Sequence, residues 1–228
     1  MIINILKILF RNELRPHEVA LFRGAVINAL DEKNVLFHNH EGDTFRYSYP
    51  LIQYKIIGGK AALVCVGEGT TAVGEFFASG NFDVVLGDRN ERLELERIEP
   101  RRFNVQVWDQ MFNYRLRRWL PLNTENYKKY QDCESLAERC VLLENILKGN
   151  ILSMGKGLGI NFDKQVKCSI SKLDEPYQVT VKDVKLMCFN IEFSCNVSLP
   201  AHVGLGKHAS LNCGIVQPKI IREKDEKQ

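Results

Sequence analysis

Two histidines separated by one residue, His38 and His40, lie in the polar segment Leu36–Lys55, whose sequence is LFHNHEGDTFRYSYPLIQYK. The residues between 39 and 43 are rich in turn formers, which favours an extended chain over a helix at this point. In an extended chain, residues two positions apart point the same way, about 6.5–7 Å from each other. Two histidines on one side suit a phosphodiester, whose cleavage needs a base and an acid at separate points.

The residue types around this pair leave three interpretations open. The histidines could hydrogen-bond their own turn, bind a metal ion as an HxH pair, or transfer protons. A metal site would need further ligands, and the sequence offers Glu41, Asp43 and His17 for this without a supporting signature.

A glycine-containing loop forms a second motif, with the sequence VGLGKHASLNCG between Val203 and Gly214. Glycines allow backbone N–H groups to approach a phosphate closely, and Lys207 and His208 add charge or hydrogen-bond donors. The loop has neither the Rossmann nor the P-loop spacing. Taken alone, it is more typical of a turn before a strand than of a phosphate site.

The composition permits a nucleic-acid partner without requiring one. With 228 residues, 45% of them hydrophobic, the chain is long enough for two domains of about 110 residues. Its net charge of +3 is only mildly basic. A group of arginines between residues 97 and 118 suits a phosphate-facing surface and a solvated strand face equally well: Arg97, Arg101, Arg102, Arg115, Arg117 and Arg118.

The cysteine pattern and the lengths of the hydrophobic runs indicate the cellular compartment in which the protein is expected. The seven cysteines are odd in number and contain no CxxC pair, which indicates reduced thiols rather than a disulfide framework or a zinc site. No apolar run approaches the about 18 residues of a membrane span. The start, MIINILKILFR, is too short for a signal peptide and lacks its basic region, so we expect a first strand there. We therefore expect a cytoplasmic protein without membrane association, bound metal or cofactor.

The hydrophobic pattern of the first half predicts the order β-α-β-β-α-β, which is the ferredoxin-like pattern. The expected elements are a strand at Ile2–Arg11, a helix at His17–Leu30, strands at Phe45–Ile57 and Lys60–Val66 joined by Gly58 and Gly59, a helix capped by Thr70 and running through Ser79, and a strand at Leu93–Trp108.

The second half repeats this order except for its second helix. We expect a strand through Arg118, one helix from about Thr124 to Gly149 or the glycines at 155–159, strands at Val166–Ile170 and Phe189–Leu199, and a last strand at Cys213–Ile221. Between Leu199 and Ala209 there is room for a loop but not for a helix. Trp108 and Trp119 flank the junction, and we expect them to pack between the two halves.

The FHNH run within Leu36–Lys55, the Gly204–Gly214 loop and the two ferredoxin-like halves together resemble the CRISPR repeat-cleaving endoribonucleases, Cas family six of the RAMP superfamily. The resemblance is to the branch with an FHNH segment after the first helix, and it covers essentially the whole chain. One difference is that the loop ends in Asn212-Cys213-Gly214, where the family commonly has glycine-aromatic-glycine. Because asparagine tolerates a left-handed backbone, we expect the turn to be retained.

The resemblance implies an α+β fold of two tandem ferredoxin-like (RRM-like) domains. Residues 1–110 would form an N-terminal domain with the catalytic histidine loop. Residues 111–228 would form a C-terminal domain with a degenerate or missing second helix and a glycine-rich RNA-binding loop before its last strand.

The resemblance also implies an activity: metal-independent cleavage of precursor CRISPR RNA into guide units, leaving a 5′-OH and a 2′,3′-cyclic phosphate. His38 and His40 would be the acid–base pair, with Tyr47 as a third catalytic residue. Substrate contacts are expected from Arg46, Lys55, Arg115, Arg117, Arg118, Gly204, Gly206, Lys207, His208 and Gly214.

The implied partners are CRISPR repeat RNA, other subunits of a CRISPR effector complex and a second copy of the chain. Two alternatives remain beside the metal-independent enzyme. One is a RAMP-type subunit that holds guide RNA without cutting it. The other is a metal-dependent nuclease that uses the His38 and His40 pair.

Overall fold

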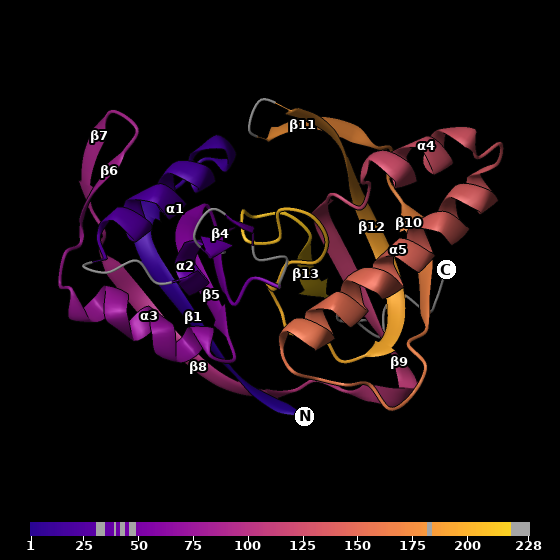
Figure 1. The fold of residues 1–228 in the computed structure, drawn as a ribbon, viewed down its shortest axis with the longest axis horizontal. Coiled ribbons are helices and arrows are strands. Elements are labelled where there is room, and N and C mark those ends of the chain that lie inside the picture. The colour runs from indigo at the N-terminus through magenta and orange to yellow at the C-terminus, as the bar shows by residue number, and fades with distance from the viewer. Residues whose placement is uncertain (31–34, 39, 42–43, 46–48, 182–183, 220–228) are drawn as a thin grey trace, which may run out of the picture. The chain divides into compact units, whose positions relative to one another are not determined.

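The computed structural model describes residues 1–30, 35–38, 40–41, 44–45, 49–181 and 184–219 (Figure 1). For Val35, His38, His40, Glu41, Thr44 and Phe45 the description is limited to the backbone. The chain divides into two compact units. The first unit consists of Met1–Val105, Ser153–Asn161 and His208–Asn212, and the rest of the chain forms the second.

The first unit is built around a sheet of four antiparallel strands in the order β4-β5-β1-β8. This is the strand order of a ferredoxin-like domain, and it confirms the expected fold of this half. The elements are β1 (Ile2–Glu13), the 3-10 turn η1 (Pro16–Glu18), α1 (Val19–Asn28), α2 (Val35–His38), β2 (His40–Glu41), β3 (Thr44–Phe45), β4 (Ile52–Ile57), β5 (Lys60–Val66), α3 (Gly69–Ala78), β6 (Asp83–Leu86), β7 (Arg89–Arg92) and β8 (Leu95–Asn104).

Three expectations for this half were wrong in detail. The strand expected at Leu93–Trp108 ends at Asn104, and a new strand begins at Val107. Thr70 does not cap α3, because the helix begins at Gly69 and the Thr70 hydroxyl donates to the Gly67 carbonyl from within the first turn. The expected strand Phe45–Ile57 is also not continuous, since β3 ends at Phe45 and β4 begins at Ile52.

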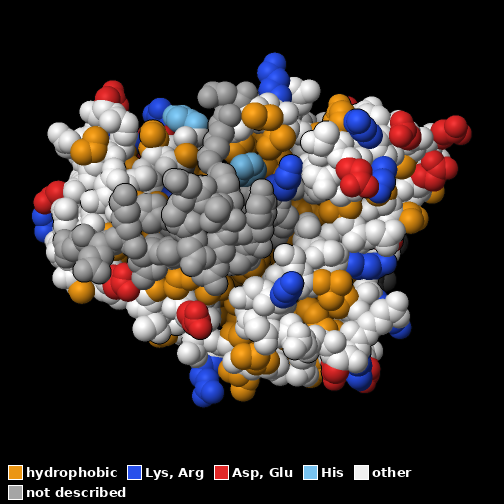
Figure 2. Space-filling view, in the orientation of Figure 1, with side chains coloured by type: hydrophobic (Ala, Val, Ile, Leu, Met, Phe, Trp, Pro, Cys, Tyr) orange, Lys and Arg blue, Asp and Glu red, His pale blue; other side chains and the backbone are white. Residues whose placement is uncertain are grey.

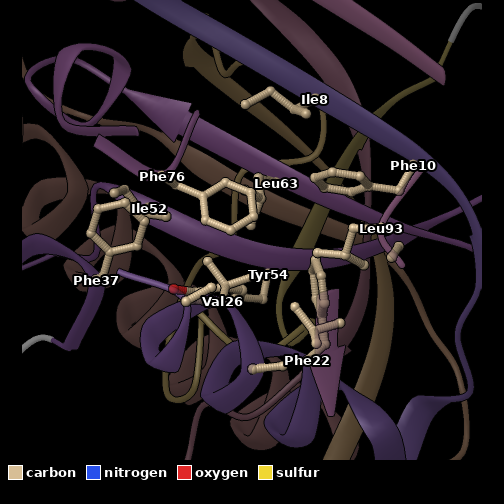
Figure 3. Packing of buried hydrophobic residues seen from close by; sticks show 14 of the residues in the cluster. Ile8, Phe10, Phe22, Val26, Phe37, Ile52, Tyr54, Leu63, Phe76 and Leu93 are labelled. Carbon is tan, nitrogen blue, oxygen red and sulfur yellow. The ribbon is translucent and has the colours of Figure 1, made fainter. Parts of the chain in front are cut away.

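The hydrophobic core of the first unit lies between its sheet and the helices α1 and α3 (Figure 3). Phe22 of α1 packs edge-on against both Phe10 of β1 and Tyr54 of β4, with ring centroids 6.0 and 5.8 Å apart. Phe37 of α2 belongs to the same cluster and is fully buried. Burying a phenylalanine of this kind contributes about 1.5–3 kcal/mol, so Phe37 fixes the short helix α2 to the core.

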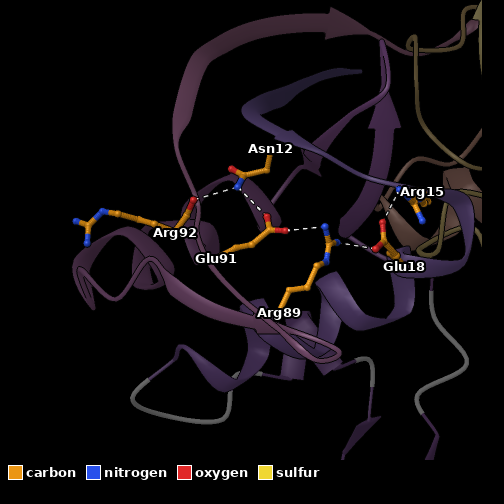
Figure 4. A network of polar contacts seen from close by, with 6 residues as sticks. All are labelled: Asn12, Arg15, Glu18, Arg89, Glu91 and Arg92. Atoms are coloured by element: carbon orange, nitrogen blue, oxygen red, sulfur yellow. Dashed lines mark hydrogen bonds and ion pairs between the residues drawn. The ribbon is translucent and has the colours of Figure 1, made fainter.

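A polar network attaches the β6–β7 hairpin to the end of β1 (Figure 4). Arg89 lies between two carboxylates, 2.6 Å from Glu18 and 3.0 Å from Glu91, and Asn12 donates to Glu91. The backbone N–H of Arg15 and the Arg89 guanidinium lower the pKa of Glu18 against the effect of its burial. The network therefore holds the start of α1 in place through an ionised Glu18.

The second unit repeats the strand order of the first, as β10-β12-β9-β13, with all of these pairs antiparallel. Residues 198–214, all of them described, hold no helix, which confirms the expected loss of the second helix. The elements are β9 (Val107–Trp119), α4 (Thr124–Asp132), α5 (Leu136–Gly157), β10 (Cys168–Leu173), β11 (Tyr177–Val181), β12 (Val184–Val197) and β13 (Ile215–Pro218), and the last turn of α5 counts with the first unit.

The helices in this unit differ from the expectation, and both tryptophans form hydrogen bonds within the unit. The single expected helix is two, because the chain is extended at Cys133 after α4 and restarts at Leu136. Trp119 is buried and donates its indole N–H to Asn150 of the same unit. Trp108 likewise donates to Ser198 of its own unit.

Candidate functional site

The histidine segment of the first unit runs between two buried aromatic residues. Phe37 precedes the histidines and is 1% exposed, while Tyr49 follows them and is 8% exposed. The Tyr49 hydroxyl accepts a hydrogen bond from Gln53 at 2.9 Å, and burial keeps the pKa of Tyr49 well above its ordinary value. A neutral, hydrogen-bonded Tyr49 thus fixes one end of the segment, and Phe37 fixes the other.

The backbone of the segment corrects the expectation of an extended pair. His38 is the last residue of helix α2, and His40 is the first residue of β2. β2 pairs antiparallel with β3, with His40 opposite Phe45 and Glu41 opposite Thr44. The helical turn exists because Phe37 is drawn into the core, and the turn-forming residues around it do not reveal this packing. Arg46 and Tyr47 lie outside the described residues.

Lys55 lies inside the first unit rather than on its surface. Its side chain is 1% exposed, and the ammonium group donates to the Ala209 carbonyl at 2.6 Å. Two more bonds hold the same loop segment against β4: the N–H of Tyr54 donates to Ser210, and the N–H of Ile56 donates to the Asn212 side chain. Residues 208–212 therefore cover the free edge of β4.

We expect Lys55→Met to lower the free energy of unfolding by about 1–3 kcal/mol, because the buried Ala209 carbonyl loses a charged donor. Chemical denaturation measures this change. Lys60→Met is the matched control: Lys60 lies on the neighbouring strand in an exposed ion pair with Glu96, so its loss should change stability by less than about 0.5 kcal/mol. Equal stability of the two variants would contradict an anchoring role for Lys55.

The glycine-containing loop of the second unit is shaped by left-handed residues. Gly206 and Gly214 have φ of 83° and 59°, and Asn212, counted with the first unit, has 58°, which confirms that asparagine retains the turn. The N–H of Gly214 donates to Arg118, and its carbonyl accepts from Leu205. Among the described residues, the N–H of Gly206 makes no hydrogen bond, so it is the loop glycine best suited to contact a phosphate.

Other candidate residues in the loop have mixed exposure. Lys207 is exposed, and its N–H donates to the Leu120 carbonyl. Gly204 is buried and bridges to Ile215, while His208 is half-buried with a φ of 53°. Asn150, whose side chain accepts from Trp119 beneath Gly206, was not expected from the sequence. Nothing in the local sequence of α5 marks that asparagine.

The arginines of the central stretch fall on two strands. Arg97, Arg101 and Arg102 lie on β8, and Arg115, Arg117 and Arg118 lie on β9. Arg115 is already paired with Glu192 at 2.8 Å, and Lys219 approaches the same carboxylate. On the face in Figure 2 the Lys and Arg side chains are scattered rather than gathered into one patch. Each arginine must therefore be judged by its own surroundings.

The described side chains include no group of three or more His, Cys, Asp and Glu that could hold a metal ion. The side chains of His38 and His40 are outside this description. No helix in the described part of the chain is long and apolar enough to cross a membrane.

The chain resembles known proteins along most of its length. Residues 1–104 match the family model of the Cas6b N-terminal domain, and residues 106–219 match that of the Cas6b C-terminal domain. An uncharacterised protein of Methanocaldococcus jannaschii is 32% identical over 111 residues, which are 48% of this chain and 74% of that protein.

Solved structures share the fold. A crystal structure of Cas6b superimposes with a TM-score of 0.88 at 24% identity, covering 96% of this chain and all of the other. A second, of a CRISPR RNA processing endoribonuclease Cas6b, has a TM-score of 0.74 at 23% identity and the same coverage. With both halves matched by their own family models, this chain belongs to the Cas6b family.

Proposed function

We propose that this protein cleaves CRISPR repeat RNA without a metal ion, by attack of the RNA's own 2′-OH on the adjacent phosphate. His38 and His40 act as the base that removes the 2′ proton and the acid that protonates the departing 5′ oxygen. The products are a 2′,3′-cyclic phosphate and a 5′-OH. Each positioned proton transfer contributes about 10²–10⁴-fold to the rate.

Residues beyond the histidines have supporting roles in this proposal. Tyr47 and Arg46 stabilise the extra negative charge that develops on the phosphate. Lys207, Gly206, Arg117 and Arg118 hold the RNA backbone, while Gly204, His208 and Gly214 shape the loop that presents them. Arg115 forms an ion pair with Glu192, so we assign it a weaker contact with the RNA. Lys55 acts indirectly, by holding residues 208–212 in place.

The observation that carries the proposal is the histidine pair itself, held between the buried Phe37 and Tyr49 in a chain whose two halves both match Cas6b domains. Histidine titrates near neutral pH, with a reference pKa of about 6.5, so one side chain can start neutral and the other protonated. Two such groups complete the reaction without a Lewis acid.

We expect the protein to cut the CRISPR repeat RNA of its own genome equally well with and without EDTA. The same RNA carrying a single 2′-deoxynucleotide 5′ to the cut should bind but resist cleavage, because the nucleophile is missing. Gel analysis of end-labelled RNA measures both. Phosphatase and kinase treatment of the products reads their ends, which should be a cyclic phosphate and a 5′-OH.

Other outcomes would support different functions. Cleavage only after addition of a divalent metal would contradict metal independence and favour a metal-dependent nuclease. Tight binding without cleavage under any condition would favour an RNA-holding subunit. Cleavage of the 2′-deoxy RNA at the normal rate would exclude the attack of the 2′-OH.

A further inference from the structure

An irregularity in the sheet of the second unit displaces Arg118. Between Leu116 and Trp119, β9 spans three residue steps while β12 spans two, from Ile191 to Phe189. This extra residue is a β-bulge, and Arg118 within it has a φ of 52°. Glycine normally occupies such a left-handed position, because other residues pay about 1–2 kcal/mol for it.

The bulge changes what the side chain of Arg118 can reach. Leu116 and Trp119 both face the core and are fully buried. In a regular strand Arg118 would follow Leu116 into the core, and Trp119 would face the opposite side. Two hydrogen bonds hold the bulged backbone: Arg118 donates its N–H to the Asn190 side chain and accepts from the N–H of Gly214. The glycine loop and β12 thus fix Arg118 jointly.

Among the residues that the structure describes, the guanidinium of Arg118 has no counter-charge. Its Nε is buried without a hydrogen-bond partner, and the group makes no ion pair with any residue that the structure describes. Arg115, on the same strand before the bulge, is by contrast neutralised by Glu192. Arg118 is half-buried. Its charge has no anionic partner among the described residues, so an anion that reaches the exposed part of the side chain would be stabilised there.

The groups beside Arg118 are neutral. Burial and the Cys188 thiol raise the pKa of Tyr177 to about 12, although Arg118 and Asn190 lower it. Burial also raises the pKa of Cys188. The Tyr177 hydroxyl interacts with Cys188 and Asn190, and the residue is 37% exposed, so its ring reaches the surface. The setting is therefore one fixed cation flanked by hydrogen-bonding groups that carry no negative charge.

We propose that Arg118, with Tyr177 and Asn190 beside it, forms a binding site for one phosphate of the RNA backbone. This inference rests on the proposed function and adds to it a defined contact on the second unit. A guanidinium can donate two parallel hydrogen bonds to a phosphate, which would also neutralise the charge of Arg118. Because the site touches a phosphate and no base, it fixes the register of the RNA without reading its sequence.

The test measures the affinity for the 2′-deoxy repeat RNA over a range of salt concentrations. Removing one cation that binds a phosphate lowers the slope of log K against log[salt] by about 0.7 for single-stranded RNA. We expect Arg118→Gln to lower the slope by about this amount and to weaken binding about tenfold at low salt. Arg118→Lys should keep the slope and bind more weakly than the wild type. Tyr177→Phe should weaken binding about threefold with an unchanged slope, since a neutral donor is removed.

Lys128→Gln is the control, because it removes one charge from an exposed position on α4 to which no role is assigned. It should leave both affinity and slope unchanged. Arg118→Asn, which suits a left-handed backbone, replaces Arg118→Gln if the latter does not fold. A variant with lower thermal stability and a wild-type slope would overturn the phosphate site in favour of a structural role. Failure of the wild type to bind the RNA would instead overturn the proposed function.

Discussion

Replacing both His38 and His40 by alanine is expected to lower the single-turnover rate of repeat RNA cleavage by at least about 10³-fold. The loss is large because both proton transfers fail together, and effects of residues that act as a unit do not simply multiply. Affinity for the RNA should change by less than about threefold, since neither histidine is assigned a share of the binding. Rapid-quench cleavage with excess protein measures the rate, and filter binding measures the affinity.

The matched control for this experiment is His17→Ala, which removes an exposed histidine of η1 in the same unit. It should cleave at the wild-type rate. Single variants add a further test: the pH–rate profile of the wild type should be bell-shaped, and each single variant should lose one limb of the bell. Full activity of the double variant would refute the site assignment, whatever the RNA affinity.

Gly214→Ala is expected to destabilise the protein by at least about 3 kcal/mol. Gly214 has a φ of 59°, a left-handed backbone conformation that destabilises alanine by about 1–2 kcal/mol. An added Cβ would also overlap the backbone carbonyl of Leu205. This carbonyl cannot move aside without breaking the hydrogen bond from the Leu205 N–H to the Gly214 carbonyl. A loss of this size should lower the midpoint of thermal unfolding by roughly 6–12 °C. RNA affinity should fall with it, because Gly214 also holds Arg118.

Gly149→Ala provides the opposite result in the same chain. Gly149 lies exposed within α5, and an added Cβ would meet nothing within 4 Å. Alanine is the better helix former by about 1 kcal/mol, so this variant should be more stable than the wild type. Differential scanning calorimetry compares the two. If both substitutions lowered the midpoint equally, the geometric argument for Gly214 would fail.

The order of the main sheet strands and of the helices that connect them could be predicted because these elements depend on local periodicity, whereas the β6–β7 hairpin and β11 were not expected. The alternation of hydrophobic and polar residues from Phe189 to Leu199 is long enough to define β12. Gly58 and Gly59 mark the turn between β4 and β5. The missing second helix was likewise visible, since the stretch after Leu199 is too short to hold one. The strand orders followed from the β-α-β-β-α-β pattern, not from any single residue.

Features of the candidate site depended on interactions that periodicity does not contain. Lys55 was expected to contact the substrate. Lysine is rarely buried, and only the Ala209 carbonyl from a distant loop explains its position inside the first unit. The bulge at Arg118 and the helical turn at His38 are similar cases. In each, a partner far along the chain outweighs the local preference of the sequence.

The edge of β4 has a consequence for synthesis on the ribosome. This strand belongs to the first 105 residues, yet the segment that covers its edge, residues 208–212, emerges about 100 residues later. At a translation rate of about 5–20 residues per second, the edge of β4 in the nascent first unit stays uncovered for roughly 5–20 s. An uncovered strand edge is a site for unwanted strand pairing. Chaperones that bind nascent chains should therefore engage this protein until residues 208–212 have emerged.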